Sequence, residues 1–83
     1  MNSRASERFW ELFEHLPADV RMLARQAFTR FRRDPFHPGL QFKQVSPRQP
    51  LWSARVSRNY RALGIRNADQ ITWIWLGTHA EYD

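Results

Sequence analysis

The sequence predicts an α+β fold in which an N-terminal helical hairpin packs on a four-stranded antiparallel sheet, as a single domain spanning residues 1–83. Apolar residues recur at helical spacing up to residue 33 and alternate with period two from residue 40. The change falls at Asp34-Pro35, where the residue before proline avoids helical geometry. Helices followed by a run of strands are typical of the α+β class. A hydrophobic share of 42% with twelve aromatic residues is enough for one small core.

Two helices are expected between residues 6 and 33. Ser3 or Ser6 can cap the first, whose apolar stripe is Phe9, Leu12, Phe13 and Leu16. Pro17 and Asp19 suit the start of the second helix. Its apolar residues recur at i, i+3, i+4, i+7, i+8 and i+11, namely Val20, Leu23, Ala24, Ala27, Phe28 and Phe31. The other face carries cations whose simplest interpretation is a solvated surface: Arg21, Arg25, Arg32 and Arg33.

Four strands are expected over about residues 40–45, 51–58, 60–66 and 70–78, separated by turns rich in proline, asparagine and aspartate. Alternation predicts a face buried under the hairpin that consists of Trp52, Ala54, Val56, Ala62, Ile74 and Leu76. The opposite face is then expected to show Arg55, Arg61, Leu63, Ile65, Trp73, Trp75 and His79. This division depends on the register near residues 57–60, because a slip of one residue exchanges the two faces.

Several classes of site are absent from the sequence. There is no cysteine, which excludes disulfides and thiolate metal sites. The three histidines, at positions 15, 37 and 79, lack ligand spacing, and the three glycines form no phosphate-binding loop. No apolar run approaches the ~18 residues that span a membrane. We therefore expect a cytoplasmic protein without a cofactor, a metal or a membrane partner.

Positive charge is the strongest signal of function. The net charge is +5, twelve of the thirteen basic residues are arginine, and residues 35–68 contain six cations and no carboxylate. Arginine binds phosphates and carboxylates through its planar fork, so a nucleic acid or an acidic protein is the expected partner. An arginine-rich composition is the alternative explanation. The candidate RNA-binding residues within this run are Lys43, Arg48, Arg58 and Arg66.

A smaller set of residues could carry catalysis. Arg55, Arg61 and His79 come from three consecutive strands, which a meander places side by side. Arginines can stabilise the charge on a pentavalent phosphorane, and histidine can transfer a proton near neutral pH. Tyr82 could stack on a base or join the proton transfer. An ordinary strand-end histidine is the alternative reading of His79.

The segment from Trp52 to Gly64, with the Trp75-Leu-Gly-Thr-His79 strand end, resembles the RelE/ParE toxin superfamily of type II toxin–antitoxin systems. The likeness covers about residues 17–79 and is closer to the RelE and YoeB mRNA interferases. It implies that Arg55 replaces a catalytic lysine, Arg61 stabilises the transition state and His79 is a YoeB-type acid or base. Tyr82 lies near the position of a base-stacking tyrosine. The resemblance also implies an acidic antitoxin that covers the basic site, in a hetero-oligomer.

The resemblance implies a ribosome-dependent mRNA endonuclease that uses attack by the RNA 2′-hydroxyl. Two alternatives remain open, a ParE-like inhibitor of DNA gyrase and a non-catalytic member that only binds its antitoxin. The chain departs from the family at Ser53, where RelE carries a further lysine, and lacks YoeB's glutamate near Gln41 or Lys43. The usual N-terminal strand is expected to be replaced by helix, and no closing helix is expected before Asp83.

Overall fold

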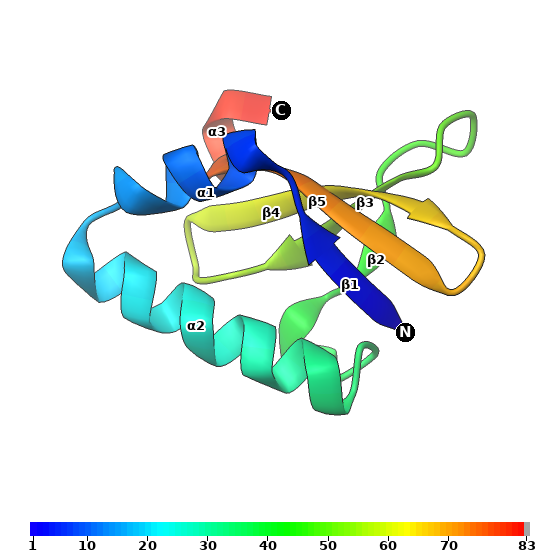
Figure 1. The fold of residues 1–83 in the computed structure, drawn as a ribbon, viewed down its shortest axis with the longest axis horizontal. Coiled ribbons are helices and arrows are strands. Elements are labelled where there is room, and N and C mark those ends of the chain that lie inside the picture. Colours follow the sequence, from blue (N-terminus) through cyan, green and yellow to red (C-terminus); the bar gives the residue numbers. More distant parts are fainter. Residues whose placement is uncertain (83) are drawn as a thin grey trace.

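The computed structural model describes residues 1–82, apart from the side chain of Tyr82 (Figure 1). The N-terminal half contains strand β1 (Asn2–Ala5) and the helices α1 (Glu7–Glu14) and α2 (Ala18–Arg33). A short 3₁₀ helix η1 (Pro38–Leu40) leads into strands β2 (Lys43–Gln44), β3 (Leu51–Arg55), β4 (Tyr60–Asn67) and β5 (Gln70–Thr78). Helix α3 (His79–Tyr82) closes the described part of the chain.

The strands form one five-stranded sheet in the order β1-β5-β4-β3-β2. The predicted α+β class is confirmed, but the sheet has one strand more than predicted. Strands β2 to β5 are antiparallel, whereas β1 pairs in parallel with β5. The Asn2 amide donates to the Asp69 carbonyl at 2.8 Å and the Ser6 amide to the Trp73 carbonyl at 2.9 Å. The expectation that helix replaces the N-terminal strand was wrong, because four mostly polar residues carry no alternating signal.

The helical hairpin is confirmed and lies on one face of the sheet (Figure 1). The Ser6 hydroxyl accepts a hydrogen bond from the Phe9 amide and caps α1. Asp34 ends α2 in an extended conformation before Pro35. The core between hairpin and sheet consists of the buried residues Phe9, Phe13, Leu16, Val20, Ala24, Ala27, Phe31, Leu40, Phe42, Ala54, Val56, Ala62, Ile71, Trp73 and Leu76.

A β-bulge in β5 changes the predicted assignment of faces. Leu63 pairs with Trp75 and Gly64 with Trp73, so Ile74 is the extra residue and the alternation reverses across it. Trp73 is therefore in the core with 4% of its surface exposed, and its placement on the open face was wrong. Ile74, predicted to be buried, is only half-buried and outside the core cluster. Trp75 remains on the open face.

Two strands are shorter than predicted, and the chain end also differs. Residues 38–40 form η1 and Gln41 has a left-handed φ of 46°, so only Lys43 and Gln44 pair with β3. Strand β3 ends at Arg55 because residues 56–59 bend back towards β4. The expectation of no closing helix was wrong, since α3 follows β5 directly. None of the helices in residues 1–82 combines the length and apolar character needed to span a membrane.

Candidate functional site

Arg55 and Arg61 lie directly opposite each other at the end of the β3–β4 hairpin. The Nη1 of Arg61 donates to three carbonyls of the turn, those of Ser57 at 2.8 Å, Tyr60 at 3.0 Å and Arg58 at 3.3 Å. The Nε of Arg55 reaches the same Ser57 carbonyl at 3.4 Å. The hairpin therefore brings two guanidinium groups to one carbonyl oxygen, as the meander predicted.

No carboxylate in the described part of the chain neutralises these two cations. Within residues 1–82 neither Arg55 nor Arg61 forms an ion pair with a carboxylate. Both side chains are partly exposed, and each retains N–H donors beyond those that bind the turn. Like charges in close proximity raise the free energy of the free protein, and an anion that binds both would relieve this repulsion. The pair is suited to a phosphate group, which accepts hydrogen bonds from several guanidinium donors.

His79 is attached to the same turn. Its backbone amide donates to the Asn59 carbonyl at 2.7 Å, while Tyr60 pairs with Thr78 and Arg61 with Gly77 in the adjacent strands. The imidazole is exposed to solvent at the first position of α3. The structure thus gathers the three predicted residues Arg55, Arg61 and His79 at one end of the sheet. Tyr82 follows one turn later in α3, with its side chain outside the described part.

The start of α3, next to His79, is held by the carboxylate half of a capping box that the sequence analysis missed. One carboxylate oxygen of Glu81 accepts hydrogen bonds from the Thr78 amide at 2.9 Å and from the Thr78 hydroxyl at 2.7 Å. The backbone hydrogen bond, followed by the hydroxyl, holds the pKa of Glu81 below its ordinary value. The Thr78-x-x-Glu81 spacing is a known sign of a helix start, so the sequence did contain this signal.

Protonating Glu81 is expected to loosen the start of α3. The pKa of Glu81 is lower in the folded state than in the unfolded chain, so its carboxylate stabilises the folded state at pH values above the ordinary glutamate pKa. This stabilisation is lost as the pH falls through the pKa that Glu81 has in the folded state. An NMR titration should show the Glu81 carboxyl titrating below the ordinary glutamate value, with the Thr78 amide shift following it. In the Thr78→Ala variant, which lacks the hydroxyl donor, the pKa of Glu81 should rise. A Glu81 pKa at or above the ordinary value in the wild type would contradict the capping box.

The open face of the sheet continues from this end as a mixed apolar and cationic surface. One row across the strands is Lys43, Ser53, Leu63 and Trp75, in which each residue pairs with the next. Lys43 is exposed and Trp75 is half-buried, whereas Ser53 and Leu63 are buried. An ideal Cβ at Gly77 would lie 2.5 Å from Cζ2 of Trp75, so the indole occupies the space above this glycine. Since Gly77 pairs with Arg61, the aromatic ring and the cation are neighbours on this face.

The remaining predicted RNA-binding residues lie in different places. Arg58 is exposed in the β3–β4 turn, whereas Arg48 is exposed in the β2–β3 loop. The Arg66 guanidinium lies 4.5 Å from the Trp52 ring centroid and also contacts the rings of Phe36 and Phe42. Arg66 comes five positions after Arg61 in β4, which corresponds to about 17 Å along a strand. Arg66 and Arg48 thus lie away from the paired arginines.

Arg30 adds a cation that the sequence analysis did not select. A hollow of about 210 Å³ lies between α2, η1 and the end of β3, and Arg30 and Arg55 both line it. Arg30 is exposed on α2 and belongs to a helix whose arginines resemble an ordinary solvated face. Its proximity to Arg55 comes from the packing of α2 against η1, which no local pattern in the sequence reports.

Comparison with solved structures gives matches over nearly the whole chain. A YoeB/ParE toxin from Agrobacterium tumefaciens is 15% identical with a TM-score of 0.71, covering 95% of this chain and 99% of that one. RelE in a RelB–RelE antitoxin–toxin complex from Methanococcus jannaschii is 15% identical with a TM-score of 0.77, covering 95% and 93%. YafQ from Escherichia coli is 14% identical with a TM-score of 0.70, covering 98% and 96%.

At these identities the structural matches show a shared fold. No curated protein sequence matches the chain. The family model of the ParE-like toxin domain matches residues 18–83, which is most of the chain and includes both arginines and His79. This chain is therefore a member of the ParE-like toxin domain family, with the fold of the RelE, YoeB and YafQ toxins.

Proposed function

We propose that the chain is a type II toxin that cleaves mRNA on the ribosome. The observation that carries this proposal is the convergence of Arg55 and Arg61 on the Ser57 carbonyl, beside the turn that holds the backbone of His79. Two guanidinium groups without a carboxylate partner among residues 1–82 provide a site for a phosphodiester. The exposed imidazole of His79, at the same end of the sheet, provides a group that can transfer a proton.

The reaction would proceed by attack of an RNA 2′-hydroxyl on the adjacent phosphorus. A bond forms between the 2′-oxygen and phosphorus, and the bond from phosphorus to the 5′-oxygen of the next nucleotide breaks. His79 would take the proton from the 2′-hydroxyl or give one to the departing 5′-oxygen, and solvent water would carry the proton of the other transfer. Arg55 and Arg61 would stabilise the additional negative charge on the phosphorane. Trp75, on the same open face, would offer an aromatic surface on which a base can stack.

The expected protein partner is an acidic antitoxin. Structures with this fold include the RelB–RelE complex of Methanococcus jannaschii and the toxin–antitoxin complex RelBE2 of Mycobacterium tuberculosis. A net charge of +5 favours association with a protein of opposite charge. We place the toxin, its mRNA substrate and the antitoxin in the cytoplasm, where the ribosome is found.

Mapping transcript ends after induced expression tests this function. We expect growth arrest with new 5′ ends inside translated regions, and no such ends when translation is blocked. The double variant Arg61→Ala/His79→Ala should fold, leave transcripts intact and permit growth. If this variant folds and still arrests growth with the same transcript ends, the assignment of these residues to cleavage is wrong.

Inhibition of DNA gyrase is the second candidate, favoured by the match to the ParE-like family model. It would give a DNA-damage response and reduced supercoiling while transcripts remain intact. A member that only binds its antitoxin would leave both growth and transcripts unchanged. The same induced culture therefore separates the three functions by transcript ends, plasmid supercoiling and growth rate.

A further inference from the structure

The hollow between α2, η1 and the end of β3 borders the paired arginines, because Arg55 is part of its lining. Four of its lining residues share one face of α2, at positions i, i+3, i+4 and i+7, namely Leu23, Gln26, Ala27 and Arg30. The other wall consists of Gly39 and Leu40 of η1, with Val56 beside Arg55. The hollow is therefore a space next to the proposed phosphate site that the proposed reaction does not yet use.

The buried part of this lining is apolar. Ala27, Leu40 and Val56 belong to the core. Leu23 lies in the apolar stripe of α2, yet 40% of its surface remains exposed. The volume of about 210 Å³ is below the ~300–1,000 Å³ of pockets that hold drug-sized ligands. The hollow therefore suits one planar group with an apolar face.

The accessible part of the lining is polar and cationic. Gln26 and Arg30 are exposed, Arg55 is half-buried, and none of the lining residues is a carboxylate. An ideal Cβ at Gly39 would lie 3.3 Å from Nη1 of Arg30, so the guanidinium rests against η1 where glycine leaves room for it. Within residues 1–82 Arg30 forms no ion pair with a carboxylate. The hollow thus combines an apolar wall with hydrogen-bond donors at its rim.

A nucleobase has the chemistry that matches this lining. It has two apolar faces and a polar edge, and its ribose links it to the phosphate that Arg55 and Arg61 would hold. Unstacked RNA bases are recognised by hydrogen bonds to their edges and by packing on side chains, arginine included. The adjacent acceptors O6 and N7 of guanine fit the fork of one arginine, whereas adenine presents an amino donor there. A phosphate is a poorer occupant, because it would lose water against the apolar wall.

We infer that this hollow binds the base of a nucleotide next to the scissile phosphate, and that Arg30 selects guanine at that position. Arg30 donates to O6 and N7, Leu23 packs on the face of the base, and the Gln26 amide lies at the same rim. Arg30 is then a specificity-determining residue and takes no part in the bond changes. The inference rests on the proposed function for its RNA substrate.

Sequencing the cleaved transcript ends tests the role of Arg30. In a translation extract the wild-type chain should cut with guanine at one fixed position beside the cut. Arg30→Ala should lower cleavage at these sites about tenfold relative to sites with another base, as expected from the loss of one bidentate base contact. Arg30→Gln should favour adenine at the same position, because glutamine binds N6 and N7 of adenine.

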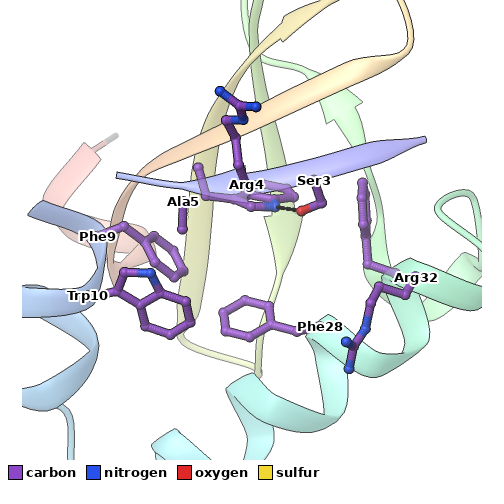
Figure 2. Close-up of a pocket in the computed structure, with 9 residues that line it drawn as sticks. Ser3, Arg4, Ala5, Phe9, Trp10, Phe28 and Arg32 are labelled. Atoms are coloured by element: carbon purple, nitrogen blue, oxygen red, sulfur yellow. Dashed lines mark hydrogen bonds between the residues drawn. The ribbon is translucent and has the colours of Figure 1, made fainter. Parts of the chain in front are cut away.

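Arg32→Ala is the matched control for Arg30→Ala. Arg32 is also an exposed arginine of α2, but residues two positions apart on a helix do not face each other. It lines a different hollow, where Figure 2 shows it on α2 with Phe28 and with Trp10 of α1. This variant has the same net charge and should keep the guanine preference. Equal loss of cleavage at all sites in Arg30→Ala would place Arg30 on a phosphate. That result, or an unchanged preference, overturns the inference.

Binding of a mononucleotide tests the hollow without any cleavage. The probe is guanosine 3′-monophosphate, titrated into the free chain and followed by NMR of the leucine methyl groups. We expect shifts at Leu23 and Leu40, with binding about tenfold weaker for uridine 3′-monophosphate and for the Arg30→Ala chain. Absence of these shifts, or equal binding of the two nucleotides, overturns the inference. The same shifts and discrimination in a chain that leaves transcripts intact overturn only mRNA cleavage.

Discussion

Replacing His79 with alanine is expected to lower the rate of mRNA cleavage by about 10²- to 10⁴-fold, the usual contribution of a general acid or base. The effect should fall on the chemical step, because the Arg55 and Arg61 guanidinium groups remain bound to the Ser57 carbonyl and can still hold the phosphate. The measurement is the rate of transcript cleavage in a translation extract at saturating chain concentration.

His15→Ala is the matched control for this variant. His15 is also an exposed histidine, and its Nδ1 lies 2.8 Å from the Glu11 carbonyl in α1, in the hairpin away from the β3–β4 turn. The His15→Ala variant should cleave mRNA at the wild-type rate. The proposed role of His79 is incorrect if His79→Ala cleaves as fast as His15→Ala at the same positions in the transcript.

Replacing Phe9 with alanine is expected to destabilise the chain by about 3–5 kcal/mol. Phe9 is 1% exposed, and its ring centroid lies 5.5 Å from that of Phe28, so it joins α1 to α2 inside the core. Small domains have a total stability of about 5–15 kcal/mol, and the loss should shift the urea midpoint strongly or unfold the chain. Urea denaturation followed by tryptophan fluorescence measures it.

Trp10→Ala provides the comparison within the same helix. Trp10 is adjacent in sequence and aromatic, but 47% of its surface is exposed and it packs edge-on against Phe9 and Phe13. The loss of this side chain should lower the free energy of unfolding by about 1 kcal/mol, as measured by urea denaturation followed by circular dichroism. Equal destabilisation by the two variants would show that burial in α1 does not determine its contribution to the core.

The sequence predicted the elements with strong periodic patterns and missed those without one. The Phe9 and Val20 stripes specify the hairpin, and Pro35 specifies its end, because each is a local signal. Strand β1 has no such signal, since four residues that pair with β5 in parallel gain their structure from a distant partner. The bulge at Ile74 was equally hidden, because a single extra residue reverses the alternation without changing the composition.

The candidate site could be predicted in part from the sequence, for a related reason. A meander places neighbouring strands side by side, so the proximity of Arg55, Arg61 and His79 followed from chain order. The contribution of Arg30 could not be predicted, because it depends on how α2 lies against η1. The stacking of Arg66 on Trp52 was hidden too, since the sequence gives the charge of a side chain and not the direction in which it leaves the sheet.

The pairing of β1 with β5 has a consequence for how the chain folds during synthesis. Asn2 lies beside Gln70, so β1 must wait until the segment around Gln70 has been made before it can join the sheet. At about 5–20 residues per second, several seconds pass between the two strands. Contacts so distant in sequence also slow folding. The sheet is therefore completed only after β5 has been synthesised.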